Sequence, residues 1–223
     1  MSNTYFLSGL PRSGSTFLYN VLKQNPELET INQGRHFGTD NSLPQLLQYK
    51  SPKIVVTYRP ILEVLASFIK LAEEFPQVNF IDVGMRNENF HALSYRPLND
   101  ARCDWLMRPN GGLDNCNTVF KNMAIYKEWF HLVNYEDLCD HTANTMTKMY
   151  NFFEIDNFTH DFNNVADTGS ADDKEEFGIP TLHKIRKGIS KSTTKPEEIL
   201  TEYVIQKYSN AMHFFTKGWF QSL

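Results

Sequence analysis

Eight residues near the start of the chain have the types and the spacing of a phosphate-binding loop. Residues 9–16 read GLPRSGST and fit the pattern G-x-x-x-x-G-x-[ST]. Glycines let backbone N–H groups approach an anion, and a helix that begins here adds unpaired N–H donors and the positive end of its dipole. The segment therefore predicts a cradle for a phosphate or sulfate group.

The loop lacks the lysine of nucleoside triphosphatases. That lysine stands directly before the hydroxyl residue, a position that Ser15 occupies here. Arg12 supplies a cation inside the loop instead, and its planar guanidinium suits the oxygens of an oxyanion. We therefore expect Arg12 to contact the bound anion and to stabilise the negative charge that develops there during a reaction.

A second arginine follows a predicted strand further along the chain. Residues 53–58 read KIVVTY, which is typical of a buried strand, and Arg59-Pro60 come directly after them. A Mg²⁺-dependent phosphotransferase needs a carboxylate at the end of a neighbouring strand to hold the metal. Arg59 in that place favours an anionic ligand that is bound without a metal.

Strands and helices alternate along the chain. Residue patterns predict strands at 4–8, 53–58 and 129–134, and helices at 15–24, 61–73, 117–127, 142–153 and 196–215. We expect exposed loop at residues 31–42, and loops with short helices at residues 75–112. This alternation predicts an α/β fold, namely one domain over residues 1–223 with a central parallel sheet flanked by helices, like that of P-loop nucleotide-binding proteins.

The composition limits the classes of partner. The chain has 22 Lys and Arg against 26 Asp and Glu, and this net charge of −4 does not favour sequence-independent binding of nucleic acid. The chain has no long apolar run and no signal-like N-terminus, so we expect no membrane span and a cytoplasmic location. Its three cysteines are far apart and form no C-x-x-C pair, which favours reduced thiols over disulfides or a zinc site.

Two ordered motifs resemble those of the sulfotransferase family that uses 3′-phosphoadenosine-5′-phosphosulfate (PAPS). The family's loop for the 5′-phosphosulfate has the form P-[KR]-[ST]-G-[ST]-[ST]. It is matched here by Pro11, Arg12, Ser13, Gly14, Ser15 and Thr16. The family's second motif, an arginine after a strand and a serine on the next helix, is matched by Arg59 and Ser67. The resemblance implies that these two residues bind the 3′-phosphate, the group that distinguishes PAPS from ATP.

Weaker matches extend the resemblance toward the C-terminus. Tyr135, in the segment YEDL, matches a family tyrosine near the adenine. The triplet Arg186-Lys187-Gly188 resembles one that closes over the 3′-phosphate in the cytosolic branch, although the residues after it differ from that branch. These positions are accordingly expected to contact the nucleotide, with adenosine 3′,5′-bisphosphate (PAP) as the product and no metal.

The general base is harder to assign. The cytosolic branch places a histidine just before a Leu-Pro pair, but Ser42 precedes Leu43-Pro44 here. His36 is the nearest imidazole, a group that titrates near neutral pH, and Asp40 is the nearest carboxylate. His36 is our first choice and Asp40 the second, while Glu27 and Glu29 stay open as in the branch that uses a glutamate.

The sequence thus predicts a PAPS-dependent sulfotransferase that transfers a sulfuryl group to a hydroxyl or amine of a small molecule or glycan. A small-molecule kinase built on the same loop is the first alternative, and Ser15 in place of lysine counts against it. A non-catalytic nucleotide-binding relative is the second alternative, because no base is certain. No motif in the sequence identifies the acceptor or the oligomeric state.

Overall fold

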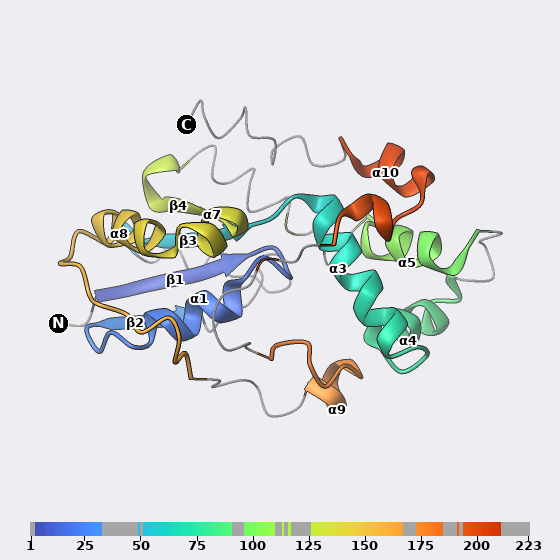
Figure 1. Ribbon diagram of the computed structural model, residues 1–223, viewed down its shortest axis with the longest axis horizontal. Coiled ribbons are helices and arrows are strands. Elements are labelled where there is room, and N and C mark those ends of the chain that lie inside the picture. The colour runs from blue at the N-terminus through green and yellow to red at the C-terminus, as the bar shows by residue number, and fades with distance from the viewer. Residues whose placement is uncertain are drawn as a thin grey trace.

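The computed structural model describes residues 3–32, 49, 51–90, 96–109, 113, 116, 126–166, 173–184, 191 and 194–210. Within these ranges the strands form one parallel sheet in the order β2-β1-β3-β4 (Figure 1). The strands are β1 (Asn3–Gly9), β2 (Leu28–Asn32), β3 (Ile54–Tyr58) and β4 (Phe130–Asn134). The predicted α/β class with a central parallel sheet is therefore confirmed.

Helices follow each of the strands β1, β3 and β4. They are α1 (Ser15–Leu22), α3 (Ile61–Glu74), α4 (Phe80–Asn87), α5 (Leu98–Leu106), α7 (Tyr135–Asp140), α8 (Thr142–Phe153), α9 (Asp173–Phe177) and α10 (Glu202–Tyr208). Short 3₁₀ turns cover Lys127–Trp129 and Pro196–Glu198. No helix within the described ranges is long and apolar enough to cross a membrane.

Both faces of the sheet are buried, each under its own set of helices. Ile54 and Val56 of β3 pack with α3, α4, α5 and α10 on one face. Val55, between them, packs with α1, α7 and α8 on the other face. This alternation explains why the strand reads as a continuous apolar run, since a parallel sheet is covered on both sides.

All strands end at the same edge of the sheet, because they are parallel. Gly9 at the end of β1 pairs with Thr57 of β3, and Tyr58 pairs with Asn134 of β4. The segments that follow β1, β3 and β4 therefore begin at the same edge (Figure 1). Open α/β sheets bind their ligands at this carboxyl edge.

Two predictions of secondary structure were wrong. No strand was expected at Leu28–Asn32, yet this segment pairs along β1 as the edge strand β2. The last helix was expected over residues 196–215, but α10 begins only at Glu202, where Thr201 caps it by accepting a hydrogen bond from the N–H of Val204. Most of the predicted 31–42 loop and of the predicted 117–127 helix lies outside the described residues.

Candidate active site

The loop between β1 and α1 depends on two glycines. Gly9 has a φ of 153°, and a Cβ there would lie 2.3 Å from the carbonyl oxygen of Thr57. Gly14 has a left-handed φ of 86°, and a Cβ there would lie 3.1 Å from a methyl group of Leu138. Arg12 also has a left-handed φ, 63°, which is uncommon for a residue with a side chain. Such strained residues concentrate at functional sites, and here the strain falls on the predicted anion-binding residue.

Ser13 holds the loop onto β3. Its hydroxyl donates a hydrogen bond to the carbonyl of Leu10 and lies 2.7 Å from the hydroxyl of Thr57. The side chain is fully buried. Ser13 can therefore offer an anion only its backbone N–H, because its hydroxyl is bound to the protein.

The first turn of α1 begins directly behind this loop. Its N-cap is Gly14, which has no side chain to cap the first N–H groups. Helices α4, α7 and α10, in contrast, are capped by the side chains of Asn79, Asn134 and Thr201. Free N–H groups at the start of a helix bind anions. The start of α1 thus has the donors that the sequence motif predicts.

Arg12 reaches from the loop to two other elements. Its Nε lies 3.2 Å from Oγ of Ser67 on α3, and its Nη1 donates a hydrogen bond to the carbonyl of Leu182. The guanidinium is only partly buried, so an anion can approach it. Arg12 and Ser67, predicted for different phosphate groups, therefore lie in direct contact.

Arg59 lies under the same loop and is only 6% exposed. Its Nη1 donates to the carbonyl of Arg12 at 3.2 Å, and its Nε donates to Glu63 at 3.0 Å. Its guanidinium carbon is 4.3 Å from the centre of the Tyr135 ring. The structure thus brings together Arg12, Arg59, Ser67 and Tyr135 from the ends of three adjacent strands and from α3.

Carboxylates also lie near the end of β3. Burial, followed by the charges of Glu63, Glu136 and Asp137, raises the pKa of Tyr58, the last residue of that strand. A hydrogen bond to Glu136 raises the pKa of Lys191. Of these carboxylates, Glu63 pairs with Arg59 and Glu136 pairs with Lys191.

Residues on both sides of the predicted basic triplet contact this site. Leu182, before the triplet, accepts the hydrogen bond from Arg12, and Lys191, after it, pairs with Glu136 next to Tyr135. The triplet Arg186-Lys187-Gly188 itself lies outside the described residues, as do His36 and Asp40.

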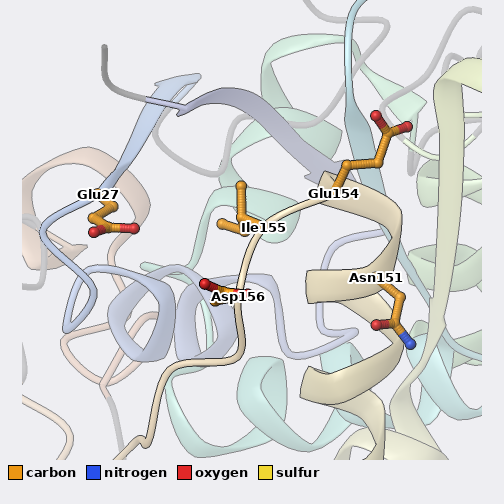
Figure 2. Close-up of a pocket in the computed structure, with 5 residues that line it drawn as sticks. All are labelled: Glu27, Asn151, Glu154, Ile155 and Asp156. Atoms are coloured by element: carbon orange, nitrogen blue, oxygen red, sulfur yellow. The ribbon is translucent and has the colours of Figure 1, made fainter.

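The other two carboxylates considered as a base lie at the wrong edge of the sheet. Glu27 comes just before β2 and Glu29 is its second residue, so both are at the amino ends of the strands. Glu27 lines an open hollow of about 530 Å³ with Asn151, Glu154, Ile155 and Asp156 (Figure 2). Its three carboxylates would repel an anionic donor. The hollow therefore does not suit a donor site, and Glu27 and Glu29 lie at the opposite edge of the sheet from the arginines that would bind the donor.

The sequence reasoning missed one pair of titratable residues near the site. Asp173 on α9 binds the imidazole of His183, the residue after Leu182, with 2.6 Å between Oδ1 and Nδ1. Their separation of ten residues fits no fixed motif. Among the described residues, no three His, Cys, Asp or Glu side chains are grouped so that they could hold a metal ion.

The model of the sulfotransferase domain family matches residues 35–218 of this chain. The chain belongs to the sulfotransferase domain family. The match begins after the 9–16 loop, so the family assignment and the loop are independent observations. The predictions of a sulfotransferase and of a transferase enzyme are confirmed.

A solved structure supports the fold of this sulfotransferase over its whole length. Mouse sulfotransferase SULT7A1, crystallised in complex with PAP, superimposes with a TM-score of 0.61 at 14% identity. The alignment covers 99% of this chain and 88% of the mouse chain. No curated protein matches the sequence.

Proposed function

We propose that the chain transfers a sulfuryl group from PAPS to a hydroxyl or amine acceptor and releases PAP. The strongest support is structural: at the carboxyl edge of the sheet, the side chain of Arg12 contacts Ser67, and the side chain of Arg59 contacts both the Arg12 carbonyl and the Tyr135 ring. Two cations for two separate anionic groups, with an aromatic ring beside them, suit a nucleotide that carries both a 5′-phosphosulfate and a 3′-phosphate. The PAP-bound mouse enzyme of the same fold is consistent with this donor.

The 9–16 loop would hold the 5′-phosphosulfate. Backbone N–H groups of Ser13, Gly14, Ser15 and Thr16 would face its oxygens, as at other helix N-termini. Pro11 would shape the turn before Arg12. An incoming phosphosulfate would replace Ser67 and Leu182 as the partners of Arg12, which is partly accessible.

Arg59 and Ser67 would bind the 3′-phosphate, and Tyr135 would contact the adenine. Arg59 is nearly buried and pairs with Glu63, so its guanidinium is already oriented before the nucleotide arrives. The triplet Arg186-Lys187-Gly188 would complete the 3′-phosphate site, since residues on both sides of it contact Arg12 and Glu136.

The transfer needs no redox partner. The acceptor oxygen or nitrogen attacks sulfur, the bond between sulfur and the bridging phosphate oxygen breaks, and the acceptor proton passes to a base. Negative charge grows on the leaving phosphate oxygen, and Arg12 would stabilise it. His36, with Asp40 as second choice, is the base predicted from sequence.

A kinase is not favoured, because the family model is that of a sulfotransferase and Arg59 follows β3 where a metal-binding carboxylate would be needed. Acceptors of the family include small molecules and macromolecules, and this chain's small-molecule or glycan acceptor is a proposal. We also propose that the chain forms a single domain over residues 1–223 and that it is cytoplasmic.

Turnover tests the proposal directly. Purified protein is incubated with PAPS and a panel of phenols, sugars, aliphatic alcohols and amines, with and without EDTA, and PAP is measured by chromatography. We expect acceptor-dependent release of PAP that EDTA does not reduce. Transfer from ATP to the panel, without transfer from PAPS, would contradict the proposal.

A further inference from the structure

Asp173 and His183 form a two-point contact beside the proposed donor site. Oδ1 of Asp173 is 2.6 Å from Nδ1 of the imidazole, and Oδ2 accepts the backbone N–H of His183 at 2.7 Å. The carboxylate side chain is 9% exposed, whereas the imidazole is 32% exposed. Both oxygens of a buried carboxylate therefore hold one histidine whose ring is open to solvent.

The segment between Asp173 and His183 is packed tightly against the rest of the protein. Gly178 ends α9 in a left-handed conformation, and a Cβ there would lie 1.7 Å from the carbonyl oxygen of Val78. Ile179 is completely buried in the core that includes α3 and α4. The ring of Phe177 meets the His183 ring edge to face at 5.6 Å. The imidazole is thus oriented by a carboxylate and an aromatic ring, both carried by α9.

The position of the pair links it to the chemistry. Leu182, the neighbour of His183, accepts a hydrogen bond from the Arg12 guanidinium. Under the proposed function, Arg12 contacts the phosphosulfate that reacts. His183 therefore follows directly, in the chain, the residue whose carbonyl contacts the arginine at the reacting end of the donor.

We infer that His183 is the general base of the transfer and that Asp173 is its positioning residue; this inference depends on the proposed function. A carboxylate only accepts hydrogen bonds, so Nδ1 carries the proton and Nε2 keeps its lone pair. The structure gives Nε2 no partner within the described part of the chain. As the acceptor attacks sulfur, its proton moves to Nε2, and the resulting imidazolium is stabilised by Asp173.

Two other roles compete with this one. His36 could be the base, as the sequence predicts, and the Asp173–His183 contact could serve only to fix the turn after α9. An asparagine at position 183 separates the second role from catalysis, because its amide can still donate to Asp173 but has no basic nitrogen.

The experiment compares His183→Asn, His183→Ala and His36→Ala, with His141→Asn as a matched control at an exposed histidine between α7 and α8. Transfer from PAPS to the best acceptor of the panel is measured from pH 5 to 9, and PAP binding is measured by calorimetry. We expect His183→Asn to bind PAP like wild type but to lose about 10²–10⁴ in kcat. Its residual rate should no longer fall at acid pH as the wild-type rate does.

Each result decides between the roles. If His183→Asn transfers at nearly the wild-type rate while His183→Ala is impaired, the contact is structural and the inference is wrong. If His36→Ala alone abolishes transfer with PAP binding intact, the base is His36 and the inference is again wrong, although the proposed function stands. Absence of both PAP binding and transfer in wild type would overturn the proposed function and the inference together.

Discussion

The two edges of the central sheet differ in charge, and this difference locates the donor site better than shape does. The amino edge has the open hollow, but Glu27, Glu154 and Asp156 line it (Figure 2). The carboxyl edge gathers Arg12 and Arg59 beside the uncapped start of α1. An anionic nucleotide needs cations and N–H donors more than empty volume, so the carboxyl edge is the site to test.

The largest expected effect is that of removing the Arg12 guanidinium. Arg12→Ala should lower the rate of transfer from PAPS by about 10²–10³, because the lost charge acts mainly as the leaving oxygen becomes anionic. PAP affinity should change by less than the rate does. Rates come from PAP release at saturating donor, and affinities come from calorimetry.

The control for Arg12 lies at the other end of the same helix. Lys23 is exposed just after α1, toward the amino edge. Lys23→Ala removes the same charge and should leave both rate and affinity unchanged. Equal losses in the two variants would mean that total charge, and not the carboxyl edge, governs the reaction.

Removing the Arg59 charge should have a smaller effect, and the effect should be on PAP affinity instead of on the rate of transfer. Arg59→Met keeps an unbranched side chain over Tyr135 but removes the charge. PAP affinity should fall about 10-fold to 100-fold, since a hydrogen bond to a charged group contributes roughly 1.5–3 kcal/mol. Lys53→Met is the matched control, because Lys53 pairs with Glu154 beside the amino-edge hollow.

Calorimetry with PAP measures both variants, after their folding has been verified by thermal unfolding. An Arg59→Met affinity within twofold of wild type would remove Arg59 from the 3′-phosphate site. A loss of affinity in Lys53→Met would move the nucleotide to the amino edge.

The donor half of the site could be predicted from sequence because it depends on local features. A glycine loop after one strand and an arginine after another are readable without a partner, and parallel strands bring their carboxyl ends together. The partners that the two arginine side chains contact were less predictable from the sequence. Arg12 contacts Ser67, while Arg59 pairs with Glu63 one helical turn further along.

Features that depend on distant partners were missed. The segment LETIN of β2 lacks a strong apolar pattern and becomes a strand only by pairing with β1. The break before α10 is fixed by Thr201, whose hydroxyl donates to Asp100 on α5. The Asp173–His183 contact depends on the turn at Gly178, which no motif marks.

The smallest predicted effect concerns stability near the amino end of β4, away from the carboxyl edge of the sheet. Burial, and then the nearby charge of Lys148, lowers the pKa of His131 on β4 to about 4. Its unfolded value is about 6.5, so the unfolded chain binds more protons between these values and the free energy of unfolding falls as the pH falls through that window.

Between pH 7 and pH 5 this group should remove about 2 kcal/mol of stability. His131→Phe keeps a ring stacked near Phe152 but cannot titrate. Urea unfolding at both pH values should therefore show a smaller acid loss in the variant than in wild type. An equal loss in both proteins would mean that His131 is accessible to protons in the folded state.

The most direct test of the central claim is a calorimetric titration of the wild-type protein with PAP and, separately, with ATP and Mg²⁺. We predict saturable binding of one PAP per chain without added metal, and binding of ATP with Mg²⁺ that is at least about tenfold weaker, because ATP lacks the 3′-phosphate that Arg59 and Ser67 would contact. ATP with Mg²⁺ binding as tightly as PAP, or PAP not binding at all, would contradict the assignment of the carboxyl edge to PAPS.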